Sequence, residues 1–134
     1  MNFRFAILIS IFLFSVPQSP LAAHHSVAAT YDSSKAMIIT GKVTQMRWGN
    51  PHSLLSLDVA GADGKPVNWK IEMGGSAIVF KPGFGKEELL SGPITLLVWP
   101  ARDGSQTAAA RQLTLPDGRQ FDIHDTFADN FEKK

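Results

Sequence analysis

Hydrophobic and polar residues alternate with a period of two along most of the chain after Thr40, which predicts strands rather than helices. The clearest alternation lies between Val67 and Met73. Its outward set is Asn68, Lys70 and Glu72. The segment from Ser53 to Val59 alternates in the same way, and its outward set is Leu54, Ser56 and Asp58. Both segments therefore predict strands with one face in a core.

Turn residues divide the rest of the chain into four further expected strands, over residues 37–48, 94–99, 108–115 and 120–123. The turns are expected at residues 61–64, Asp103-Gly104 and Asp117-Gly118, because the Asp-Gly pair tolerates the positive φ of tight turns. Gly41 interrupts the first strand and is interpreted as a bulge or bend. Trp69 shares the apolar phase of its strand and Trp99 is in phase with Leu97, so both are expected in the core.

The stretch between the third and fourth strands is helical in character. Ser76 is a candidate cap for a short helix over 77–81 that ends at Pro82-Gly83, and a helical turn is expected over 86–90. Three strands, a helical connection and further strands predict an all-β, OB-fold-like five-stranded barrel with one short helix. A sandwich with a covering helix would produce the same pattern. In OB folds, strands 2 and 3 and the loops 1–2 and 4–5 form the ligand face, which here directs attention to residues 48–52 and 100–107.

Residues 1–23 have the three parts of a signal peptide: Arg4, an apolar run over 5–16 and small residues ending in Ala22-Ala23. The run is shorter than the roughly 20 apolar residues of a membrane span, so export and cleavage are expected, with an uncleaved anchor as the alternative. Cleavage is expected after Ala23 or Ala22. The remaining chain divides into an arm (24–36), the barrel domain (37–124) and a charged tail (125–134), in a periplasmic or secreted protein.

The charge of the chain is balanced, and this excludes some partners. Without Arg4, the 13 Lys and Arg residues become 12, against 12 Asp and Glu. Nucleic acid and, after signal cleavage, anionic membrane surfaces are not expected partners, because both need a surplus of cations. The chain has no cysteine, which excludes disulfides, thiolate metal sites and thiol nucleophiles.

Several motifs resemble those of a family of small exported bacterial proteins of unknown function. They are Ala23-His24-His25-Ser26, Gly41-Lys42-Val43, Trp48-Gly49-Asn50-Pro51-His52, Asp63-Gly64-Lys65, Asn68-Trp69-Lys70-Ile71-Glu72, Ala101-Arg102-Asp103-Gly104 and Leu115-Pro116-Asp117-Gly118. The most specific are the His-His-Ser start and the Trp-x-Asn-Pro-His segment. The resemblance implies the compartment and the OB-like fold. It implies no activity.

His24 and His25 are candidate metal ligands, because cleavage would place one of them at or near a free N-terminus. After cleavage at Ala23, the α-amine and ring of His24 form a bidentate chelate. After cleavage at Ala22, His25 becomes the third residue of the chain. The α-amine, two deprotonated backbone amides and the ring of His25 can then surround Cu(II) or Ni(II) in a plane. Amine and imidazole nitrogens suit Cu(II), Ni(II) and, less selectively, Zn(II), so copper is the expected cofactor if any is held. The alternative is a solvated arm that binds nothing specific.

His52 is the candidate third metal ligand, beside the expected ligand loop. The alternative is a histidine whose ring bonds a backbone group and holds the loop. Trp48, Asn50 and Glu72 are candidate ligand-binding residues at the same corner. Glu72 is outward on the strand that should pair with the one after His52, which permits a His–carboxylate cluster. Trp48 has a core position as its alternative, and His124, near the tail, is the weakest metal candidate.

Enzyme motifs do not occur in the sequence. Ile78 stands where a nucleophile elbow beginning at Gly74 would need its second glycine, and no phosphate loop or dinucleotide motif is present. The sequence therefore predicts a non-catalytic binding domain that holds a copper-type metal through His24, His25 and His52. The alternative is a metal-free module for a protein or small-molecule ligand. A copper-dependent oxidoreductase is a third hypothesis.

Overall fold

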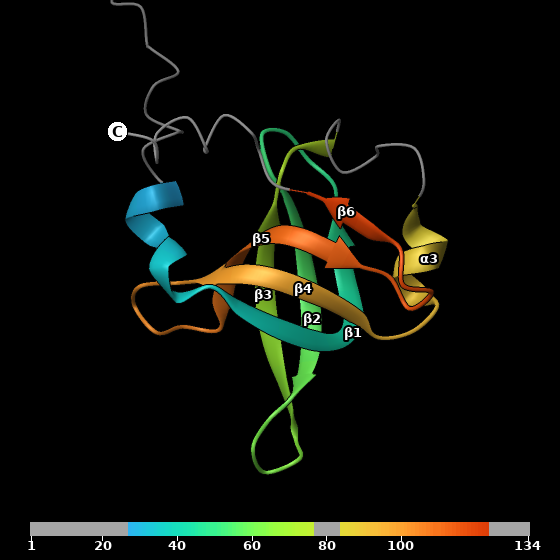
Figure 1. Ribbon diagram of the computed structural model, residues 1–134, viewed down its shortest axis with the longest axis horizontal. Helices are drawn as coiled ribbons and strands as arrows, with labels where there is room; N and C mark the ends of the chain where they lie inside the picture. The colour runs from blue at the N-terminus through green and yellow to red at the C-terminus, as the bar shows by residue number, and fades with distance from the viewer. Residues whose placement is uncertain (1–26, 77–83, 124–134) are drawn as a thin grey trace, which may run out of the picture.

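A computed structural model describes residues 27–76 and 84–123, and Figure 1 shows their arrangement. The strands are β1 (Met37–Arg47), β2 (Ser53–Ala60), β3 (Pro66–Met73), β4 (Ile94–Pro100), β5 (Thr107–Thr114) and β6 (Gln120–Asp122). The helical elements are short: η1 (Ser33–Lys35), α3 (Lys86–Leu90) and a turn over residues 27–30. In the described residues no helix is long and apolar enough to cross a membrane.

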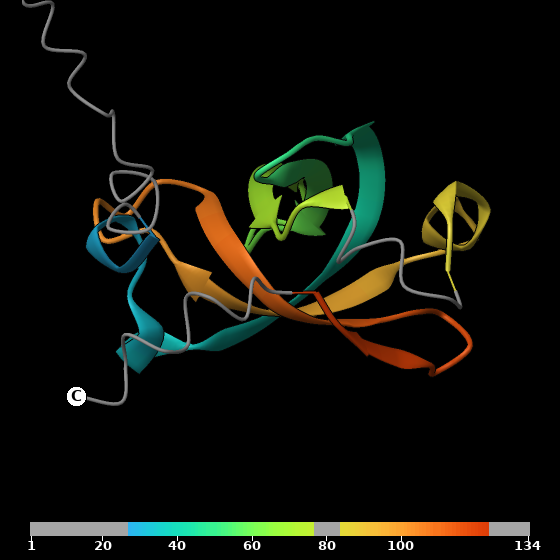
Figure 2. The same cartoon turned by 90° about the horizontal axis from the view of Figure 1, so that it is seen from above.

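The strands close into a five-stranded barrel, which confirms the expected fold class. The order along the sheet is β3-β2-β1-β4-β5, and a parallel pairing of β3 with β5 closes it. A sandwich is therefore excluded. β6 pairs with the far end of β5, beyond the segment of β5 that β3 contacts. In Figures 1 and 2 the β2–β3 hairpin projects from the barrel, while α3 and the helical turn before η1 lie on opposite sides of it.

β1 belongs to both halves of the barrel. Its first residues pair with β4 and its later residues with β2, and Gly41 is paired on both sides. The register shift expected at Gly41 lies instead between Val43 and Gln45, so the bulge prediction is wrong in position. Gly41 is required for another reason: a Cβ there would stand 2.3 Å from the carbonyl oxygen of Asp58.

The alternating residues fill the barrel as expected. The buried core includes Ile39, Leu55, Leu57, Ile71, Met73, Ile94, Leu96, Val98 and Leu113. Trp69 is partly buried against this core. The prediction for Trp99 is wrong, because its phase partner Leu97 is 37% exposed and points outward. Trp99 instead packs outside the barrel core, against a second cluster and beneath the guanidinium of Arg111.

The expected turns are confirmed at Gly64, Gly104 and Gly118, which have φ values of 77°, 77° and 88°. The helical turn over 86–90 is confirmed as α3. The helix expected over 77–81, the leader (1–23) and the tail (125–134) lie outside the described residues.

The segment over residues 27–36, here called the N-terminal segment, packs onto the barrel. Tyr31 is 4% exposed and forms a small cluster with Ala101 and Ala109, to which Val27 and Trp99 add. The backbone N–H of Asp32 donates to the carbonyl of Pro100, and that of Arg102 donates to the carbonyl of Thr30. This part of the expected arm is therefore a packed element.

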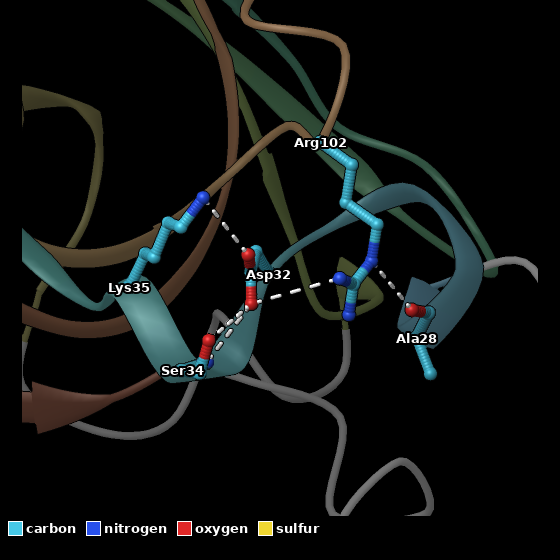
Figure 3. A network of polar contacts seen from close by, with 5 residues as sticks. All are labelled: Ala28, Asp32, Ser34, Lys35 and Arg102. Atoms are coloured by element: carbon cyan, nitrogen blue, oxygen red, sulfur yellow. Dashed lines mark hydrogen bonds and ion pairs between the residues drawn. The ribbon is translucent and has the colours of Figure 1, made fainter.

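Asp32 organises the polar side of the N-terminal segment (Figure 3). Its carboxylate accepts from the Ser34 hydroxyl at 2.6 Å and lies 3.6 Å from Lys35 Nζ and 3.7 Å from Arg102 Nη1. Arg102 Nε also donates to the carbonyl of Ala28 at 3.3 Å. The hydrogen bond from Ser34, followed by the charges of Arg102 and Lys35, lowers the pKa of the Asp32 carboxyl.

Candidate functional site

The carboxylate of Glu72 joins three distant parts of the chain. Oε1 lies 2.5 Å from His52 Nδ1, and Oε2 accepts a 2.6 Å hydrogen bond from the Tyr31 hydroxyl. Glu72 lies on β3, His52 immediately before β2, and Tyr31 in the N-terminal segment. The structure thus brings together two of the expected site residues and adds Tyr31.

The strand register explains how Glu72 and His52 meet. Glu72 pairs with Leu54, and both face outward because Leu55 and Ile71 face the core. His52 is two residues before Leu54, so it continues the outward row. The side chains of His52 and Glu72 are only 25% and 22% exposed to solvent.

The contact with Glu72 has a chemical consequence for His52. A neutral imidazole that donates through Nδ1–H has its lone pair on Nε2, where it can bind a metal or accept a proton. The expected alternative for His52 was a bond to a backbone group, whereas its partner here is a carboxylate. A carboxylate behind a histidine is the arrangement that orients metal-binding imidazoles.

Tyr31 is held as a neutral donor. Burial raises the pKa of its phenol, and the hydrogen bond to Glu72, the charge of Glu72 and the charge of Asp103 raise it further. The hydroxyl therefore keeps its proton at neutral pH and continues to donate to Glu72. This hydrogen bond fastens the N-terminal segment to β3.

Asn50 and Trp48 hold the corner in which His52 lies. The Asn50–Pro51 peptide bond is cis, and Asn50 Oδ1 accepts from the backbone N–H and hydroxyl of Ser76 at 3.2 and 3.3 Å. Trp48 is partly buried against the main core. Both residues thus have structural contacts, and their ligand-binding role stays a prediction.

His24, His25 and His124 lie outside the described residues, so the proposed three-histidine set stays a prediction. Within residues 27–76 and 84–123, no group of three His, Asp or Glu side chains is placed to hold a metal ion. His52 and Glu72 form a contacting pair of such side chains. A metal ion at His52 Nε2 would therefore need further ligands from other parts of the chain.

A pocket of about 310 Å³ adjoins the Glu72 carboxylate on the outer face of β1, β2 and β3. Its lining residues are Tyr31, Gln45, Arg47, Leu54, Leu55, Ser56, Lys70, Glu72 and Thr107. It lies on the strand 2–3 face that the OB-fold analogy indicates. Trp48 and Asn50 are not among its lining residues.

Tyr31, Arg47 and Lys70 were not identified from the sequence. Tyr31 is 41 residues from Glu72, so no local spacing links them. Its one available signal is that it is the single tyrosine of the chain and precedes the first strand. Lys70 was expected only as an outward strand residue, and Arg47 only as part of the first expected strand.

Comparison with known proteins places the chain in a family. The model of a family of unknown function, DUF6152, matches residues 13–110. The chain belongs to DUF6152. The match covers the positions of both N-terminal histidines, Tyr31, His52 and Glu72, and it ends within β5. No curated protein and no solved structure matches the chain significantly. Family membership therefore supplies no activity for this DUF6152 protein.

Proposed function

We propose that the protein is an exported, non-catalytic binding domain that holds a copper-type metal ion through His52 together with His24 and His25. The observation that carries the proposal is the position of the Glu72 carboxylate. It contacts His52 and also accepts a hydrogen bond from the Tyr31 hydroxyl. One acidic group thereby connects the candidate ligand on the barrel with the segment that follows the two N-terminal histidines.

The first support is the orientation of His52. Its Nδ1 contacts Glu72, which restricts rotation of the ring and leaves Nε2 as the nitrogen available to a metal ion. Such outer carboxylates increase the basicity of the ligating nitrogen and hold the ring, and their loss typically costs about 10–100-fold in metal affinity.

The second support is the short chain length between Tyr31 and the histidines. His25 lies six positions before Tyr31, and six fully extended residues span at most about 22 Å. The helical turn at 27–30 shortens this reach, since a helix rises about 1.5 Å per residue. Because Tyr31 is bonded to Glu72, which contacts His52, this chain length is the span that a site shared with His52 would have to bridge.

The third support is the donor chemistry. Cleavage after Ala23 would supply the α-amine and imidazole of His24, and His52 would add a further imidazole. Nitrogen donors of this kind favour Cu(II) over other common divalent ions. The α-amine has a pKa of roughly 8, so Cu(II) can displace its proton near neutral pH.

Calorimetric titration of Cu(II) into protein beginning at His24, verified by intact mass, tests the proposal. We expect His24→Ala and His52→Ala each to weaken binding by at least about tenfold, and Glu72→Gln to weaken it within the range for an outer carboxylate. His124→Ala is the matched control and should bind as the parent does. A methionine before His24 should remove the N-terminal chelate.

Electron paramagnetic resonance of the Cu(II) form gives an independent readout. Coupling to several nitrogens is expected in the parent, with fewer in His52→Ala. Unchanged affinity and spectrum in His52→Ala would overturn the shared site, and no heat in the parent would overturn metal binding altogether.

A further inference from the structure

The pocket beside Glu72 is lined by charged and apolar side chains that have no part in the proposed metal site. It is built on two rows of paired outward residues across β1, β2 and β3. One row is Gln45, Ser56 and Lys70, and the other is Arg47, Leu54 and Glu72. The hydroxymethyl side chain of Ser56 stands between longer neighbours, which leaves room above the centre of the sheet. Tyr31 and Thr107 line the same pocket from the N-terminal segment and β5.

Two cations, Arg47 and Lys70, line this pocket. Within the described residues, neither Arg47 nor Lys70 has a carboxylate within ion-pair distance. By contrast, four other cations pair with aspartates nearby in the structure: Lys35, Lys65, Arg102 and Arg119. The one acid in the pocket, Glu72, already accepts bonds from Tyr31 and His52 on its two oxygens. As far as residues 27–76 and 84–123 are concerned, the pocket therefore presents positive charge that no ion pair neutralises.

The pocket also offers an apolar surface and neutral polar groups. The side chain of Leu54 supplies the apolar surface, and Gln45, Ser56 and Thr107 add hydrogen-bonding groups. A volume of about 310 Å³ lies at the lower end of small-ligand pockets. A simple inorganic ion would fill little of it, since a water molecule takes about 30 Å³. Size and lining thus favour an organic molecule with one charged end.

We propose that this pocket binds a small organic anion, in which a carboxylate meets Arg47 and Lys70 and an apolar body lies on Leu54. The planar guanidinium of Arg47 can bind both carboxylate oxygens, and Lys70 supplies a second charge. Contact with Leu54 removes apolar ligand surface from water. This binding needs no metal ion, so it goes beyond the copper proposal.

Nuclear magnetic resonance titration of metal-free protein beginning at His24 tests this inference, with benzoate as the probe. Benzoate should shift the amide signals of Leu54, Ser56 and Lys70. Benzamide, its neutral isostere, should bind at least about tenfold more weakly, as expected for loss of a charge-assisted bidentate contact. Inorganic phosphate should bind more weakly than benzoate, because it lacks the apolar body.

Substitutions of single cations show whether benzoate binds in this pocket or is attracted by positive charge anywhere on the surface. Arg47→Gln and Lys70→Gln should each weaken benzoate binding by roughly tenfold, the loss of one charged hydrogen-bonding partner. Lys42→Gln is the matched control, since Lys42 is an exposed cation of β1 outside the pocket. Amide signal dispersion shows whether each variant is folded.

Several outcomes would overturn the inference. Equal binding of benzamide would show that charge plays no part, and equal binding of phosphate would show a simple ion site. The same loss in Lys42→Gln would show a diffuse charge effect, and unchanged amide signals on β2 and β3 would exclude the pocket. Copper binding is measured separately, so its failure leaves the benzoate result intact.

Discussion

Tyr31 shows how a single side chain can connect the N-terminal segment to the barrel. Its ring is buried with Ala101 and Ala109, while its hydroxyl reaches the outward-facing Glu72. A buried phenol needs a hydrogen-bond partner, and a carboxylate is a strong one. The same contact that satisfies Tyr31 orients the carboxylate toward His52.

The titration of Tyr31 tests this arrangement, and as the single tyrosine it can be followed by the ultraviolet absorbance of tyrosinate. We expect ionisation well above the ordinary pKa of about 10, because burial and Glu72 raise the pKa of the phenol. A raised tyrosine pKa contributes stability that is complete below pH 10 or so and is lost as the pH rises further. Glu72→Gln should bring the ionisation closer to the ordinary value. Ionisation of the parent near its ordinary pKa would contradict the buried hydrogen bond.

At the scale of elements, the close contact of β1 with β2 depends on Gly41. The residue pairs with Val59 on one side and Ile94 on the other, where β1 passes from one half of the barrel to the other. A methyl group there would collide with the Asp58 backbone, which cannot move without disturbing β2. Gly64, in the β2–β3 turn, differs because it has a φ of 77° and open space around its Cβ position.

Alanine substitutions at Gly41 and Gly64 should distinguish the cost of a steric collision from the cost of a left-handed backbone conformation. Gly41→Ala should lower the free energy of unfolding by about 2–3 kcal/mol, the upper part of the range for overpacking, because the clash is with backbone. Gly64→Ala should cost about 1 kcal/mol, since only the left-handed backbone is strained. Urea unfolding measures both. Equal losses would contradict the view that the collision with Asp58 determines the need for Gly41.

The strands and turns could be predicted because their signals are local. Alternation reports which side of a strand faces the core, and Asp-Gly pairs report positive φ, as Gly104 and Gly118 show. The function of Gly41, the register shift after Val43 and the position of Trp99 depend on neighbouring strands. The meeting of Tyr31 with Glu72 depends on closure of the barrel, which no sequence spacing encodes.

At the scale of the whole molecule, the N-terminal segment is fastened to the outside of the barrel. It is attached through the Tyr31–Glu72 bond, through backbone bonds to Pro100 and Arg102, and through the Asp32 network. Tyr31 bonds to Glu72 on β3 and packs on Ala101 and Ala109, while the adjacent Asp32 contacts Pro100 and Arg102. Docking of the segment therefore depends on two neighbouring residues with different partners.

Acid should loosen this docking through Asp32. Its pKa is lowered by the hydrogen bond from Ser34 and by Arg102 and Lys35, so its contribution is complete above the ordinary pKa of about 3.9 and lost as the pH falls below it. Amide hydrogen exchange at Asp32 and Arg102, whose N–H groups bond across the junction, should report this loss. Asp32→Asn should lower the protection of these amides against exchange severalfold at neutral pH, and acid should then cause no further loss of protection.

Asp117→Asn is the matched control for the Asp32 prediction. The pKa of Asp117 is also lowered, by hydrogen bonds from Arg119, but the residue lies in the β5–β6 turn away from the N-terminal segment. The Asp117→Asn substitution should leave amide hydrogen exchange at Asp32 and Arg102 unchanged. If the docked segment also holds the histidines near His52, Asp32→Asn should weaken Cu(II) binding while Asp117→Asn does not. Faster exchange with undiminished copper affinity would show that docking and metal binding are separate properties of this barrel.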